Sequence, residues 1–279
     1  MQRSLIRLFR FLPLWLLYGF MAMVIPFYVL LDGRARRASW QLFRRRLGYK
    51  PLPSAWHVYL NMFSMGQVVL DRFAAYAGKP FRVEDATVSL FRQLCESSRG
   101  AVLLSAHVGS FEMTGYMLTA GKPLSVLVYG GETATVMQNR SRMFGLRGVS
   151  MVPVSDDLSH LYTLSGALSR GELVSLPSDR IFGSPKRVRC PFLGAEASFP
   201  AGPFSLALSR EVPAVAVFCL KTGYRSYRLH LEELPVPPGS RREQVQAMAR
   251  SYSLALEKTV RACPDQWFNF YDFWADEAN

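Results

Sequence analysis

Short apolar runs alternate with helical patterns over the last two thirds of the chain. Six runs of strand length are rich in Val, Leu and Ala: residues 101–106, 124–128, 149–154, 173–176, 214–220 and 227–231. Four segments between these runs and one after them have helical spacing: residues 111–120, 135–146, 158–169, 203–209 and 241–263. This alternation predicts an α/β domain whose largely parallel sheet is flanked by helices.

The preceding part of the chain has only helical patterns. Residues 34–79 place apolar side chains at helical intervals, among them Leu60, Val68 and Phe73. We therefore predict an N-terminal membrane-associated helix in residues 1–33 and a single larger domain in residues 34–279. Within that domain, residues 34–99 are helical and cover the body, and residues 100–279 form its α/β part.

Residues 11–31 carry no charge and are rich in Leu, Phe, Trp, Met and Val. About 20 such residues can cross a bilayer as a helix. No small-residue cleavage site follows the segment, and its length exceeds a usual signal core, so a cleaved signal peptide is disfavoured. Because Pro13, Gly19 and Pro26 interrupt the run, the pattern leaves open whether the helix spans the membrane or lies in its interface.

The net charge of +12 is concentrated at the N-terminus. Residues 1–50 contain ten Arg or Lys and a single acid, Asp32. Arginines beside an apolar helix are typical of contact with anionic headgroups, which favours a membrane over nucleic acid as the partner. The larger basic cluster follows the apolar run, which predicts that the main body faces the cytoplasm. The four cysteines are widely spaced and suit a reducing compartment.

The first buried run ends in a group of residues that can perform chemistry. His107 follows residues 101–106, and Glu112 falls in the opening turn of the next predicted helix, where Ser110 can cap it. A carboxylate against one ring nitrogen would leave the other nitrogen free to accept a proton. Gly109 would allow a tight turn and the close approach of a substrate. The spacing therefore predicts a catalytic His107–Glu112 pair at the carboxyl end of a strand.

The block from Gly100 to Glu112 resembles the HX4D/E motif of the lysophospholipid acyltransferase superfamily, and most closely the lipid A biosynthesis (lauroyl and myristoyl) acyltransferases. The likeness continues through residues 176–180 (LPSDR), 188–194 and 213–218. It implies an acyltransferase that moves a fatty acyl group from a thioester to a hydroxyl or amine of a membrane lipid or glycolipid. It further implies a bacterial inner-membrane location, acyl carrier protein or acyl-CoA as donor, and no cofactor.

The resemblance also assigns roles to residues outside the motif. His107 is carried over as general base, with Glu112 as its orienting partner. Asp179 and Arg180 are carried over to substrate binding, together with Gly109 and Ser110. The family has an arginine between these motifs, for which Arg140, Arg142 and Arg147 compete; we choose Arg140.

Two departures from the family bear on the acceptor. Ser110-Phe111 stands where the family usually has Asn-Trp, and the aromatic C-terminal segment, residues 266–274, is more similar to stand-alone relatives of aryl polyene and other specialised lipid pathways. An aryl polyene or amino-acid lipid is therefore an alternative acceptor. A membrane-anchored lipid-binding protein and a thioesterase are alternatives from other functional classes.

The remaining motifs are less specific. No GxSxG elbow, P-loop or GxGxxG occurs. The basic run Lys186, Arg187 and Arg189 suits either an acidic carrier protein or a solvated loop. The aromatic C-terminal segment suits an acyl channel, the membrane interface or core packing. His57, His160 and His230 lack metal-ligand spacing and are interpreted as structural.

Overall fold

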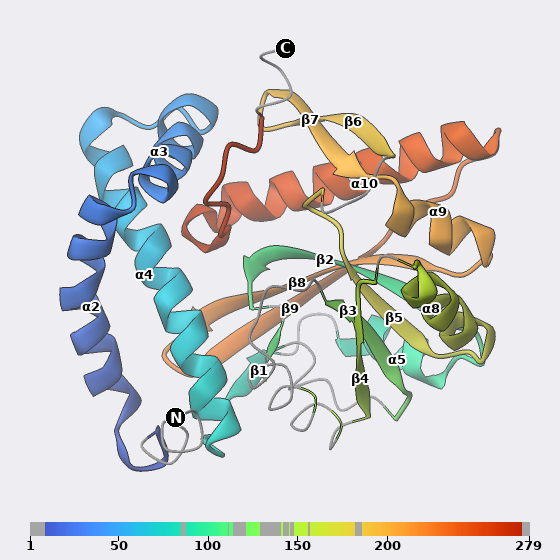
Figure 1. Cartoon of the computed structure of the whole chain (residues 1–279), viewed down its shortest axis with the longest axis horizontal. Helices are drawn as coiled ribbons and strands as arrows, with labels where there is room; N and C mark the ends of the chain where they lie inside the picture. Colours follow the sequence, from blue (N-terminus) through green and yellow to red (C-terminus); the bar gives the residue numbers. More distant parts are fainter. Residues whose placement is uncertain are drawn as a thin grey trace.

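The computed structural model describes residues 9–84, 88–110, 112–113, 121–128, 141, 145, 148–155, 157–181 and 186–274. Its centre is a seven-stranded sheet in the order β1–β9–β8–β2–β5–β3–β4 (Figure 1). Every neighbouring pair is parallel except β8 with β9. The bounds are β1 Arg82–Glu84, β2 Ala101–Gly109, β3 Leu124–Val128, β4 Val149–Pro153, β5 Leu173–Pro177, β8 Ala214–Gly223 and β9 Ser226–Glu233. The predicted α/β architecture with a largely parallel sheet is confirmed.

Helices cover both faces of this sheet. The alternate side chains Val102 and Leu104 of β2 belong to one core with residues of α8 (Ser159–Ser169), α9 (Gly202–Ser209) and α10 (Arg241–Ala262). Ala101 and Leu103 belong to a second core with residues of α5 (Val88–Glu96). Because successive strand residues point to opposite faces, a strand buried on both sides is apolar at nearly every position. This burial explains the continuous run in residues 101–106.

The apolar runs locate most strands closely, with three differences. The short edge strand β1 falls within residues 34–99, which were predicted to be helical. β2 continues through Gly109, because after a register irregularity the strand pairs again with β8 at Cys219. His107 therefore lies inside the last part of the strand and not just past its end. A two-stranded antiparallel hairpin, β6 (Arg187–Phe192) and β7 (Ala195–Pro200), was not predicted. β6 alternates exposed and buried residues and contains Pro191, and β7 has Glu196 and Ser198 among its apolar residues, so neither strand gave a continuous apolar run.

The described residues include little of two predicted helices. Glu112 and Met113 are helical, as predicted for residues 111–120, whereas residues 114–120 lie outside the described part. Most of the predicted helix 135–146 also lies outside it.

The N-terminal part consists of helices that pack along one side of the body (Figure 1). These are α2 (Leu14–Leu31), α3 (Gly33–Gln41), the π-helical turn η1 (Leu42–Arg46) and the long α4 (Pro51–Tyr76). Among the described residues, α2 is the one helix long and apolar enough to cross a membrane. α4 begins with Pro51 in its first turn, where the missing N–H costs no hydrogen bond.

Candidate active site

The carboxyl ends of the neighbouring strands β2 and β5 bring a histidine and an aspartate together. Ser105 of β2 pairs with Pro177 of β5 in parallel register. His107 and Asp179 each follow their paired residue by two positions. Asp179 Oδ1 lies 2.8 Å from His107 Nδ1, and Asp179 Oδ2 accepts the backbone N–H of His107 at 2.8 Å. The register of two adjacent strands therefore sets the position of this pair.

Asp179 is fully buried, whereas about a third of the His107 side chain is exposed. Burial alone would raise the pKa of the Asp179 carboxyl, but the His107 ring and the neighbouring Arg180 hold that pKa below its ordinary value. Trp267 Nε1 donates a further hydrogen bond to Oδ2 at 3.4 Å. An ionised Asp179 accepts a hydrogen bond from the N–H at Nδ1, which fixes the tautomer and makes Nε2 the nitrogen that can act as a base.

The sequence spacing predicts Glu112 as the carboxylate on the His107 ring, but the carboxylate hydrogen-bonded to Nδ1 is Asp179. Glu112 instead accepts hydrogen bonds from Arg72 at 2.8 Å and from Tyr76 at 3.3 Å, both on α4. The physical reason is the cation on α4, since a largely buried carboxylate needs a charged partner. Glu112 still lines the same cavity as His107, and its catalytic role stays a prediction.

Gly109 makes the tight turn that the sequence predicts. Its φ is +62°, and a Cβ atom at this position would lie 2.0 Å from the carbonyl oxygen of Cys219. The next residue, Ser110, donates its backbone N–H to the same carbonyl at 2.7 Å. Its hydroxyl accepts the backbone N–H of Met113 at 3.3 Å, as predicted for a helix cap.

Arg180 ties the C-terminal segment to the site. Its guanidinium donates to the carbonyl of Phe268 at 2.6 Å and lies 5.5 Å from the ring centroid of Tyr271. The backbone N–H of Phe268 in turn donates to the carbonyl of His107 at 2.8 Å. The C-terminal aromatic residues thus serve two purposes. Trp267, Phe273 and Trp274 are buried in the core, and Phe268, Phe270 and Tyr271 line the cavity.

The cavity beside His107 has a volume of about 350 Å³, the size of a small ligand site. One wall consists of the apolar α4 side chains Met65, Val68 and Val69. The polar wall contains His107, Ser110 and Glu112, with the guanidinium groups of Arg72 and Arg180. This combination suits a substrate with a hydrocarbon chain and a reacting polar group.

Arg72 is the site residue that sequence reasoning missed. It lies 40 positions before Glu112, in a helix predicted only to cover the body. Its sequence context gives no signal, because an arginine on an amphipathic helix is usually solvated. Arg140, Arg142 and Arg147 lie outside the described residues.

The other histidines have local partners. His57 Nδ1 lies 2.7 Å from Asp265 Oδ1, and His160 Nδ1 accepts the backbone N–H of Ser155 at 3.2 Å. His230 Nε2 lies 3.6 Å from a carboxylate oxygen of Glu232. Within the described part of the chain, no three His, Cys, Asp or Glu side chains form a group that could hold a metal ion.

Comparison with models of protein families identifies the family of this chain. A family model described as bacterial lipid A biosynthesis acyltransferase matches residues 84–275, more than half of the chain. The matched span includes His107, Glu112, Asp179 and Arg180. A search of curated proteins gave no match.

Proposed function

Since the chain belongs to the bacterial lipid A biosynthesis acyltransferases and is an acyltransferase of that type, we propose that it moves a fatty acyl group from acyl carrier protein to a glycolipid in the membrane. The acceptor atom is a hydroxyl oxygen or an amine nitrogen. The observation that carries this proposal is the buried Asp179 on Nδ1 of a half-buried His107, at the wall of a largely apolar cavity.

In the proposed reaction His107 is the general base. The acceptor O–H gives its proton to Nε2 as its oxygen attacks the carbonyl carbon of the thioester. The C–S bond then breaks, and the sulfur takes the proton from the imidazolium. The products are an ester and a free thiol. Asp179 stabilises the imidazolium while it exists.

Charge on the thioester carbonyl oxygen needs a positive partner in the transition state. The guanidinium groups of Arg72 and Arg180 line the cavity and are the candidates. Glu112 holds Arg72 in place through the 2.8 Å ion pair. In this proposal Glu112 is a positioning residue, and the orienting role that the motif suggested for it belongs to Asp179.

The donor is proposed to be acyl carrier protein, with acyl-CoA as the rival. Carrier proteins are acidic, and Arg187 and Arg189 occupy the exposed positions of β6, beside exposed Lys186. The kinetics of acyl transfer with each donor, measured at increasing salt concentration, distinguish the two. Screening should lower kcat/KM for the acyl carrier protein more than kcat/KM for acyl-CoA. A clear preference for acyl-CoA would contradict the choice.

The test of the reaction measures thiol release and lipid acylation together, with acyl carrier protein as donor and a lipid A-type glycolipid as acceptor. His107→Ala should lower turnover by about 10²–10⁴-fold. His230→Ala is the matched control, because His230 lies on β9 with a similarly exposed side chain and outside the cavity. Near-wild-type transfer by His107→Ala would overturn the assignment.

The same assay separates the alternatives. Thiol release without an acceptor would identify a thioesterase, and binding without release would identify a lipid-binding protein. Acylation of a polyene or an amino-acid lipid in place of the glycolipid would correct the acceptor alone.

Attachment to the bacterial inner membrane, with the body in the cytoplasm, is proposed from α2. This helix has a mean hydropathy of 2.1 and only 17% of its residues are buried. Cell fractionation of the full chain tests the attachment, and recovery in the soluble fraction would contradict it.

A further inference from the structure

α2 has two faces, and both are apolar. The positions that pack on the body recur at helical spacing: Leu14, Leu17, Tyr18, Met21, Ala22, Ile25 and Val29. The opposite face exposes Trp15, Phe20, Met23, Phe27 and Leu31, all of them at least 63% accessible. A surface helix in water carries polar residues on its outer face. Lipid is therefore the environment that suits the outer face of α2.

The inner face of α2 is packed on α4 along its length. Tyr59 donates to the carbonyl of Ala22 at 3.3 Å. Gly66 allows the closest approach, since a Cβ there would lie 3.0 Å from the Cγ and Sδ atoms of Met21. Near the start of α2, Phe9 and Phe73 have ring centroids 5.7 Å apart. The two helices therefore run antiparallel, side by side (Figure 1).

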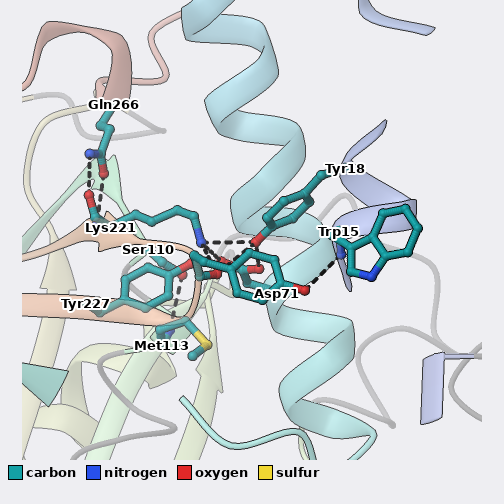
Figure 2. Close-up of polar contacts among 9 residues, drawn as sticks. Trp15, Tyr18, Asp71, Ser110, Met113, Lys221, Tyr227 and Gln266 are labelled. Atoms are coloured by element: carbon teal, nitrogen blue, oxygen red, sulfur yellow. Dashed lines mark hydrogen bonds and ion pairs between the residues drawn. The ribbon is translucent and has the colours of Figure 1, made fainter. Parts of the chain in front are cut away.

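A buried polar cluster fixes the N-terminal half of α2 to the body (Figure 2). Asp71 of α4 accepts hydrogen bonds from Tyr18 of α2 and from Tyr227 of β9, and it pairs with Lys221 of β8 at 2.5 Å. Asp71 is completely buried, and burial raises the pKa of its carboxyl and lowers the pKa of the Lys221 ammonium. Trp15 also donates its backbone N–H to Tyr224 at 2.9 Å.

The other side of α4 packs on the body over most of its length. Contacts run from His57, which pairs with Asp265, through Asn61, which donates to the Trp267 carbonyl at 3.0 Å, to Arg72 at the active site. Fifteen helical residues span about 22 Å. α4 thus lies between α2 and the sheet (Figure 1). If α2 stood along the membrane normal, α4 and the part of the body packed on it would lie at the depth of the hydrocarbon. The polar groups of that part would then lose their contact with water.

The basic residues at the two ends of α2 agree with a helix that lies in the plane of the membrane. Arg10 precedes α2, and Arg34, Arg36 and Arg37 follow it, all of them exposed. A spanning helix would place these two groups on opposite sides of the membrane. A helix in the membrane plane places both at the headgroups of one leaflet.

We propose that α2 does not cross the membrane but lies in the plane of one leaflet, docked on α4, with both ends at the same anionic surface. This inference rests on the membrane attachment proposed above and not on the acyl transfer. Trp56 of α4, 59% exposed and stacked on Tyr59, extends the lipid-facing surface. Met65 and Val68 of α4 line the cavity, so this helix lies between the proposed lipid-facing surface and the cavity that contains His107.

The orientation is tested by labelling single cysteines from each side of the membrane. The background replaces the four native cysteines and must keep membrane attachment. Phe11→Cys and Arg34→Cys report the two ends of α2, and Lys258→Cys, exposed on α10, marks the side of the body. In sealed inside-out vesicles, an impermeant maleimide should label all three positions. In spheroplasts it should label none. Labelling of position 11 from the side opposite to position 34 would overturn the proposal.

A cross-link tests the docked state directly. The pair Met21→Cys and Gly66→Cys is close enough for a disulfide. The oxidised protein should keep the membrane binding and activity of its reduced form. Loss of membrane binding on oxidation would mean that α2 must leave α4 to enter the bilayer, and would contradict in-plane docking.

Substitutions on the outer face test lipid contact. Phe20→Asp and Phe27→Asp should each weaken binding to vesicles of anionic lipid by about tenfold or more. Leu254→Asp is the matched control, since Leu254 is 58% exposed on α10 and should not affect binding. Equal binding by all variants would overturn the proposed surface. Point variants are preferable to deletion of α2, because deletion would remove Tyr18 from buried Asp71.

Discussion

Asp179 accepts two hydrogen bonds from a single residue, His107, one from its backbone N–H and one from its ring, both at 2.8 Å. Two contacts to one carboxylate fix both the position of the main chain and the orientation of the ring. The carboxylate is fully buried and its pKa is held below the ordinary value by this histidine first and by Arg180 second. The pair is thus prepared to act as a unit.

Replacement of Asp179 should therefore lower kcat nearly as much as replacement of the general base His107. Asp179→Asn should lower kcat by about 10²–10⁴-fold, because an amide cannot stabilise the imidazolium and can select the wrong tautomer. The double variant with His107→Ala should be little worse than His107→Ala alone. Steady-state kinetics of the three variants measure this. Fully additive losses would show that the two residues act independently.

Glu112 and Arg72 should form a second unit. Glu112→Gln and Arg72→Gln should each lower kcat/KM, and the double variant should lose less than the sum of the two losses, since each change removes the same ion pair. Arg170 and Glu172 provide the control, because this ion pair contains a carboxylate that is mostly buried like that of Glu112 but lies away from the cavity. Glu172→Gln should leave kcat/KM unchanged. A wild-type rate for Glu112→Gln would remove Glu112 from the site.

The lowered pKa of Asp179 predicts how stability depends on pH. An acid whose pKa is lower in the folded state binds its proton more weakly there than in the unfolded chain. Its stabilising contribution is complete above about pH 4 and is lost as the pH falls through the lowered folded value. Denaturant unfolding of the wild type and of Asp179→Asn between pH 6 and pH 3 measures it. The difference in unfolding free energy should shrink below about pH 4, and growth of this difference would contradict the assignment.

Substitutions at two glycines distinguish the cost of a positive φ from the cost of a steric clash. Gly109 and Gly194 both have positive φ, +62° and +78°, but only at Gly109 would a Cβ meet a backbone oxygen, at 2.0 Å. Gly194→Ala should cost about 1–2 kcal/mol of unfolding free energy. Gly109→Ala should cost more than that and should also lower activity, because the β2 main chain beside His107 must shift. Thermal and denaturant unfolding, with an activity assay, compare the two. Equal stability costs would contradict the close approach.

The hydrophobic pattern by itself determined the fold class and most strands of the sheet. Buried parallel strands are apolar at nearly every position, so residues 101–106 and Leu124–Val128 can be recognised as strands from the sequence. The pattern also located His107 near a strand end and Ser110 at a helix start. It did not predict the three-residue strand β1, nor the hairpin of β6 and β7, of which β6 alternates exposed and buried residues.

Only the tertiary structure decided which groups meet. Strand order is not encoded locally, and it is the pairing of β2 with β5 that brings Asp179 to His107 across 72 positions of the chain. Glu112 meets Arg72 because α4 packs across the carboxyl end of β2. The length and apolarity of α2 permitted either a spanning or an interfacial helix. Its packing on α4 and the buried Asp71–Lys221 pair favour the proposed interfacial helix. The buried pair holds Tyr18 of α2 against the body, and such a contact between distant residues cannot be read from the composition of α2.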